Sequence, residues 1–137
     1  MADTFNLMHD FHVTSVFVDA LAATILIRGA YPDRVGPDFR EAEFRGVAGY
    51  HFEGDALGTI LFEIVEVDPL ELYQRYSEPM RKNRQERGGH APWVETEQTA
   101  MRFINKHGLR GFALHSSIGF NGAVWAADYR TRTLTNL

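Results

Sequence analysis

Residues 68–107 carry the helical patterns of this sequence, and patterns typical of β-strands lie both before and after this block. Strands and helices do not alternate one by one, so nothing requires the parallel sheet of βαβ units. The order predicts an α+β fold with an antiparallel sheet of about six strands, arranged along the chain as β-β-β-β-α-α-β-β. Two or three helices are expected to pack on one face. A parallel pairing between the strands that flank the helices stays open.

The first strand pattern covers residues 12–28, where β-branched and aromatic residues are frequent. We interpret it as two strands joined by a turn at Asp19-Ala20. One long bent strand, or a helix through the alanines at positions 20, 22 and 23, are the alternatives. Residues 29–38 contain two prolines and two glycines and are expected to form a loop.

The clearest hairpin pattern joins residues 44–53 to residues 60–65. A three-residue loop at 54–56 would pair Tyr50 with Ile60 and Ala48 with Phe62. This register places both strongly apolar sets on one face, and a slip of one residue would separate them. The opposite face also carries apolar residues, which motivates a homodimer hypothesis: Val47, Leu61, Val65 and Val67.

Residues typical of helix ends predict two helices. Asp68, with Pro69 at the first helical position, is a good helix start. Pro79 is expected to end or kink this helix near Ser77, or to begin a new helical segment that reaches about residue 87. A further helix is expected from about Glu95 to His107, with Gly108 after its C-terminus. Its predicted buried stripe contains Ala100, Met101, Phe103 and Ile104.

The last hairpin is predicted to turn at Asn121-Gly122, because this dipeptide favours a tight two-residue turn. With 137 residues and 45% hydrophobic content, residues 1–137 fit a single domain with its own core. Residues 1–10 and 131–137 are expected to be loosely ordered.

Composition excludes several kinds of chemistry. The chain has no cysteine, which excludes disulfides and cysteine-based metal sites. Its net charge of −4 argues against general nucleic-acid binding. No apolar run is long enough to span a bilayer, and the first residues do not resemble a secretory signal. We therefore expect a cytoplasmic protein with no membrane association, no cofactor and no metal.

Charge is unevenly distributed along the chain. Residues 41–71 contain eight acids and one base, whereas residues 72–90 contain five bases and two acids. The basic segment is a candidate docking site for an anion or a protein partner. Its candidate residues are Arg81, Lys82, Arg84, Arg87 and His90. An ordinary solvated helix face is the alternative interpretation.

A second candidate site is the polar face of the middle hairpin, with His51, Glu53, Glu63 and Arg45. A carboxylate beside a histidine can support acid–base chemistry or ligand binding, but cross-strand ion pairs give the same pattern. Two other groups are weaker. The His9 and His12 pair lacks a third metal ligand, and His115 with Ser117 lacks the third group and the elbow motif of a hydrolase.

These observations favour a non-catalytic binding or regulatory protein over an enzyme. It would be of an immunity-like or partner-docking kind and would use its segregated acidic and basic surfaces. A possible protein partner and a homodimer are the expected interactions. The alternative is a small-molecule-binding protein or small enzyme, with a His/Glu pocket between sheet and helices.

Overall fold

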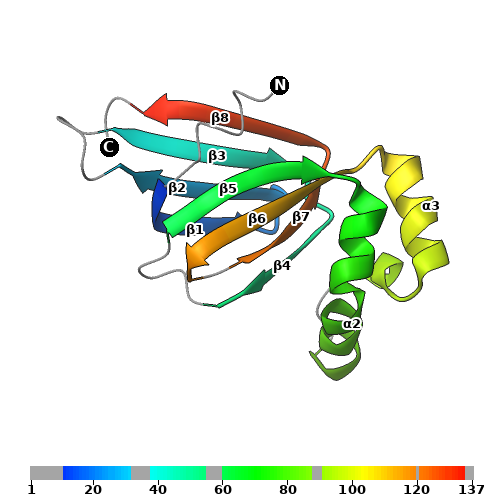
Figure 1. Ribbon diagram of the computed structural model, residues 1–137. Coiled ribbons are helices and arrows are strands. Elements are labelled where there is room, and N and C mark those ends of the chain that lie inside the picture. The colour runs from blue at the N-terminus through cyan, green and yellow to red at the C-terminus, as the bar shows by residue number, and fades with distance from the viewer. Residues whose placement is uncertain (1–10, 32–37, 55–59, 88–90, 120, 135–137) are drawn as a thin grey trace.

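The computed structural model describes residues 11–31, 38–54, 60–87, 91–119 and 121–134. They form an α+β fold with antiparallel strands, as predicted, but with eight strands rather than six (Figure 1). Two α-helices and one short 3-10 helix separate β5 from β6. The elements are β1 (Phe11–Asp19), β2 (Thr24–Ala30), β3 (Phe39–Arg45), β4 (Gly49–Glu53), β5 (Ile60–Val67), α2 (Pro69–Arg87), η1 (Pro92–Val94), α3 (Glu97–His107), β6 (Arg110–Ile118), β7 (Asn121–Ala126) and β8 (Asp128–Leu134).

The strands lie in the order β4-β7-β6-β5-β1-β2-β3-β8, and every described pairing is antiparallel. The sheet has two halves of four strands. Among the described residues, β1 and β5 connect the halves through two residue pairs, Phe11 with Leu61 and His12 with Ile60. The parallel pairing that the sequence left open therefore does not occur among the described strands.

The inner faces of the two halves pack against each other and form the first core. Tyr129 of β8 stacks on Phe44 of β3 with ring centroids 4.9 Å apart, and both rings contact Phe112 of β6. Each such buried side chain contributes roughly 1.5–3 kcal/mol relative to exposure. The other buried members are apolar residues from both halves: Ile25, Ile27, Ala42, Ile64, Leu114, Val124 and Ala126.

The outer face of β6 and β7 forms the second core with the helices, which gather at one end of the strands in Figure 1. Small residues on this face, such as Ala113 and Ala123, let the helical layer approach closely. Trp125 is fully buried there, and its indole Nε1 donates a hydrogen bond to the carbonyl oxygen of Pro69 at 2.9 Å. The expected packing of helices on one face is thus present.

The two additional strands arise because two predicted strands bend at the same place. The first bends at Gly46, between β3 and β4, and the second bends at Ala127, between β7 and β8. The Ala127 amide donates to the carbonyl oxygens of Arg45 and Gly46, at 3.0 and 3.2 Å. Gly46 has φ +61°, and a Cβ atom there would lie 2.8 Å from the Ala127 Cβ. At this corner both strands pass from one half of the sheet to the other.

The predicted middle hairpin is wrong. β4 pairs with β7, with Tyr50 opposite Val124, and β5 pairs with β6 and β1. Tyr50 and Ile60 are therefore not partners. Gly122 explains the preference for β7, since a Cβ atom at that position would lie 2.2 Å from the carbonyl oxygen of His51. The distant glycine allows a close strand contact that the local alternation pattern could not reveal.

The helix α2 begins as predicted, because an Asp68 side-chain oxygen accepts hydrogen bonds from the amides of Leu70 and Glu71. The helix does not end near Ser77, since it continues through Pro79 to Arg87. Buried side chains on both sides of the proline anchor it to the second core: Leu72, Tyr73 and Met80.

The helix α3 is also close to its predicted bounds. Thr96 and Thr99 form a capping box at its start, and Gly108 ends it in the left-handed conformation with φ 58°. Of the predicted stripe, Ala100 and Ile104 are buried and Phe103 is partly buried, whereas Met101 is 42% exposed. Met101 is therefore a correction to that stripe.

The terminal strands differ from prediction in two ways. Asn121 and Gly122 lie inside β7 rather than in a turn, and Asn121 Oδ1 accepts a hydrogen bond from the Ser116 amide at 2.8 Å. β8 reaches Leu134 and pairs with β3, so residues 131–134 belong to a strand instead of a loose tail. The turn between β1 and β2 is confirmed. Residues 1–10, 135–137 and most of the predicted loop at 29–38 lie outside the described part.

Candidate functional site

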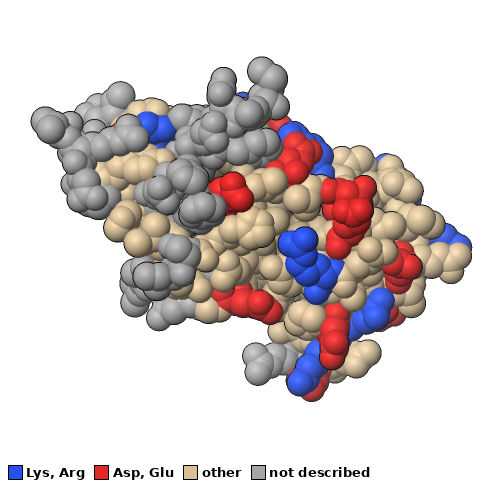
Figure 2. Space-filling view, viewed as in Figure 1, with Lys and Arg blue, Asp and Glu red and all other residues tan. Residues whose placement is uncertain are grey.

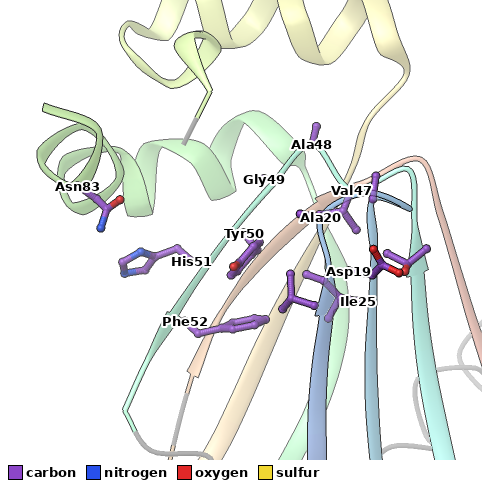
Figure 3. A pocket seen from close by; sticks show the side chains of 13 residues that line it. Asp19, Ala20, Ile25, Val47, Ala48, Gly49, Tyr50, His51, Phe52 and Asn83 are labelled. Atoms are coloured by element: carbon purple, nitrogen blue, oxygen red, sulfur yellow. The ribbon is translucent and has the colours of Figure 1, made fainter. Parts of the chain in front are cut away.

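A pocket of about 530 Å³ opens between β4 and the turn that joins β1 to β2 (Figure 3). Its volume is within the range of roughly 300–1,000 Å³ that is usual for small-molecule sites. One further wall comes from α2. The described residues that line it are Val18, Asp19, Ala20, Ala23, Thr24, Ile25, Val47, Ala48, Gly49, Tyr50, His51, Phe52 and Asn83.

Two strand edges without strand partners border this pocket. β4 pairs with β7 on one side only. β1 pairs with β2 along its length, but with β5 only at Phe11 and His12. Within the described ranges, no strand pairs with the second edge of β4 or with that side of β1 beyond His12. On that side of β1 beyond His12, backbone N–H and C=O groups can hydrogen-bond to a ligand or to water.

The apolar part of the lining comes from both halves of the sheet. Ile25 of β2 is fully buried, and Phe52 of β4 packs against the first core. Tyr50 lies beside Phe52 with ring centroids 5.0 Å apart. At the mouth, Val18 is 39% exposed, and its neighbours outside the lining, Phe17 and Leu21, are even more exposed. A ligand that covers this mouth would remove exposed apolar surface from water.

Asp19 is the acidic group of the pocket. Its Oδ1 atom accepts hydrogen bonds from the amides of Leu21 and Ala22, each at 3.0 Å. This arrangement holds the turn in place and fixes the carboxylate at the end of β1. The second oxygen, Oδ2, has no hydrogen-bond partner among the described residues, so it can accept a hydrogen bond from a ligand.

His51 is held in position by two neighbours. Its Nε2 atom lies 3.2 Å from Glu53 Oε2, and its ring lies 5.5 Å from the ring of Tyr76 in α2. Burial raises the pKa of Tyr76, and the nearby charge of Glu53 raises it further, so this phenol stays neutral at neutral pH. In Figure 3, His51 projects from β4 towards Asn83, whereas Phe52 projects from the opposite face.

Of the predicted His/Glu site, only His51 and Glu53 come together. Glu63 lies on β5 opposite His115 of β6. Arg45 lies at the end of β3 and forms an ion pair with Glu43, with Nε and Oε2 3.1 Å apart. The four residues are separated because the hairpin that would have aligned them does not form.

The predicted basic docking residues are partly used inside the molecule. Arg81 donates to the Tyr73 hydroxyl at 2.8 Å and lies over that ring. Arg84 forms an ion pair with Glu95 at 2.8 Å, while Lys82 is exposed. The side chain of Arg87 and all of His90 lie outside the described part.

Two acids of the 41–71 segment, Glu41 and Glu66, pair with arginines from elsewhere in the chain. Glu41 is 1% exposed, and it binds Arg28 at 2.6 Å and Arg132 at 2.7 Å. Glu66 binds Arg110 at 2.9 Å, and this hydrogen bond holds the pKa of the carboxyl below its usual value. Figure 2 shows acidic and basic side chains intermixed over the visible face. The charge contrast along the sequence is therefore reduced in space.

The histidine pair does not form a metal site in the described part of the chain, and the Ser117 side chain, proposed beside His115, lies outside that part. His12 lies on β1, and His9 is outside the described residues. Between residues 11 and 134, leaving out the undescribed gaps, no group of three or more potential metal ligands occurs. Nor is any described helix long and apolar enough to cross a bilayer.

The apolar side chains that motivated a dimer are partly covered within the protomer. Val47 packs against the first core, and Val67 packs against the second. Val65 is half-buried on β5, and nothing is described for the Leu61 side chain. The homodimer therefore remains a prediction, and these apolar side chains no longer support it.

No family model, curated protein or solved structure matches this chain.

Sequence reasoning found His51 and Glu53 but missed most of the pocket. Asp19 was interpreted only as a turn residue, and no local pattern indicates that Asn83 of α2 approaches β4. The signal available in the sequence is that Phe17, Val18 and Leu21 flank the predicted turn; the structure leaves all three exposed.

Proposed function

We propose that this protein is a non-catalytic binding protein that takes a small amphipathic molecule into the pocket beside His51. The observation that supports the proposal is the mixed lining. Accessible apolar side chains, such as Val18 and Phe52, line the same pocket as polar groups that include Asp19 and His51. Such a pocket buries the apolar body of a ligand while a few polar groups fix its orientation.

The polar groups define the ligand further. Asp19 offers an acceptor oxygen, and Asn83 offers both a donor and an acceptor. A ligand with a hydroxyl or amino group at one end would satisfy Asp19 while its apolar part contacts Val18 and Phe52. A ligand with a carboxylate at that end would be repelled by Asp19.

Binding is favoured over catalysis for a chemical reason. Thr24 and Asp19 are lining groups that could act as nucleophiles, but neither forms a hydrogen bond with His51 that would activate it. The His51–Glu53 pair can orient and hydrogen-bond a polar group without a covalent step. The partner-docking function, which the sequence favoured, has less support where arginines from outside residues 41–71 pair with Glu41 and Glu66.

The test fills the pocket without disturbing the core. Ala20 is an exposed turn residue in the pocket lining, and Ala22 is an exposed residue of the same turn outside it. A library of small amphipathic molecules is screened by ligand-observed NMR against the wild type, Ala20→Trp and Ala22→Trp. We expect amino- and hydroxyl-terminated compounds to bind the wild type and Ala22→Trp, and to lose binding to Ala20→Trp. If no compound binds, or if hits bind Ala20→Trp unchanged, the proposal is wrong.

The role of His51 is tested with the same hits. His51→Ala removes a polar contact that is held in place by Glu53 and should weaken binding by about tenfold, equal to roughly 1.4 kcal/mol. His107→Ala serves as the control, because His107 is exposed on α3 and does not line the pocket. Equal affinities for both variants would remove His51 from the site.

A further inference from the structure

A second concave surface lies on the far side of Trp93, between η1 and α3. This surface, the Trp93 groove, has a volume of about 430 Å³. It shares no described lining residue with the pocket beside His51. Its floor and rim are formed by Pro92, Trp93, Thr99, Arg102, Phe103 and Lys106.

The floor of the groove is rigid and apolar. The Trp93 and Phe103 rings stack nearly parallel, with centroids 5.5 Å apart and an angle of 5° between their planes. Trp93 Nε1 donates to the Ala48 carbonyl at 3.1 Å, and the Trp93 ring meets the edge of Trp125. Thr99 Oγ1 donates to the Trp93 carbonyl at 3.0 Å. These contacts form the floor before any partner arrives, which lowers the entropic cost of binding.

The rim of the groove is positively charged. Arg102 and Lys106 are one helical turn apart on the same face of α3, and both are exposed. Neither has an ion-pair partner among the described residues. Most described arginines do have such a partner, and Arg75 and Lys82 of α2, which also have none among the described residues, do not line the groove.

We infer that the Trp93 groove binds an acidic peptide segment of a partner protein, with one bulky apolar side chain seated against the partly exposed Phe103 ring, which stacks on the buried Trp93. The two unpaired cations would contact acidic residues on either side of that anchor. An apolar anchor surrounded by complementary charge is a common arrangement in protein recognition. The inference does not depend on the pocket beside His51.

The test uses a fluorescent eight-residue peptide with a central phenylalanine flanked by glutamates and aspartates. Two matched peptides replace the phenylalanine with serine, or all the acids with lysine. Fluorescence anisotropy should show binding of the first peptide with a dissociation constant below about 1 mM, and weaker binding at high salt. The serine and lysine peptides should bind at least about tenfold more weakly.

Two protein variants locate the site. Arg102→Glu with Lys106→Glu should abolish peptide binding. Arg75→Glu with Lys82→Glu makes the same change in net charge on exposed positions of α2 and should leave affinity within about twofold. Circular dichroism checks that both variants are folded.

Three results would overturn the inference. The phenylalanine peptide does not bind even at about 5 mM; it binds no better than the serine peptide; or the α2 variant loses as much affinity as the α3 variant. Binding of a free aromatic carboxylate, 2-naphthoate, in place of the peptide and with the same dependence on Arg102 and Lys106 would instead show a small-molecule site.

Discussion

Glu41 is the only charged residue that is buried in the described part of the chain. It lies in the middle of β3, between Arg28 of β2 and Arg132 of β8, which are its cross-strand partners. Both arginines remain substantially exposed, with 40% and 65% of their side chains accessible. The carboxylate has lost water but has gained charge-assisted hydrogen bonds on both oxygens. It therefore connects three strands across one face of the sheet.

This arrangement predicts the effect of Glu41→Gln. The substitution keeps the shape but removes the charge, and it should lower the free energy of unfolding by about 1.5–3 kcal/mol. The control is Glu43→Gln, two residues along the same strand, where the carboxylate is partly exposed and pairs with Arg45. That change should cost less than about 1 kcal/mol. Urea denaturation measures both, and equal losses would contradict the account of Glu41.

Ala23 is the only described residue other than glycine with a positive φ, at 54°. This conformation directs its carbonyl oxygen to the Val47 amide, at 2.8 Å, and so links the β1–β2 turn to the corner before β4. For a residue with a Cβ atom, the left-handed region costs roughly 1–2 kcal/mol.

Ala23→Gly should therefore stabilise the protein by about 0.5–1 kcal/mol, after the entropy that glycine adds to the unfolded chain is subtracted. Ala22→Gly, the neighbouring position without a positive φ, should not stabilise it. Thermal denaturation of both variants tests this. A lower melting temperature for Ala23→Gly would show that the turn does not strain Ala23.

At the scale of elements, helix ends were easier to predict than strand pairings. Asp68 and Pro69 begin α2, and Gly108 ends α3, because capping depends on residues within one turn of the helix end. Strand pairing instead depends on distant residues. Gly122 is needed beside His51, yet the two positions are far apart in sequence.

Pro79 is a local signal for the end of a helix, but tertiary packing keeps α2 helical through it. A proline inside a helix removes one backbone hydrogen bond and costs roughly 3 kcal/mol, but Met80 and Tyr73 are buried on either side of it. Pro79→Ala should therefore raise the free energy of unfolding by about 2 kcal/mol, because the unfolded chain also gains some entropy. Glu78→Ala, an exposed change in the same turn, should stay within about 0.5 kcal/mol. Chemical denaturation measures the free energy of unfolding of both variants. If Pro79→Ala does not raise it, α2 is not a continuous helix.

For the whole molecule, the corner at Gly46 and Ala127 allows two strands to serve both halves of the sheet. Gly46→Ala combines a left-handed backbone with a steric clash. Gly108→Ala has a similar φ of 58° but open space around the new Cβ atom. Gly108→Ala should cost about 1–2 kcal/mol, and Gly46→Ala should cost at least about 1 kcal/mol more. Equal costs, measured by urea denaturation, would mean that the corner is not tightly packed.

The corner at Gly46 and Ala127 also explains why the candidate site was only partly predictable from the sequence. His51 and Glu53 are two residues apart on β4, so their proximity follows from strand periodicity. Asp19 and Asn83 reach the same pocket from β1 and α2, and their positions depend on the corner and on the second core. Glu63, which the hairpin pattern placed beside His51, lies on another strand for the same reason.

The most direct test of the proposed binding function is a backbone amide NMR titration with the best small-molecule hit. We expect the shift changes to concentrate at residues 18–25, at residues 47–52 and at Asn83, with α3 unaffected. Shift changes that concentrate on α3, or that spread evenly over the molecule, would contradict a ligand site beside His51.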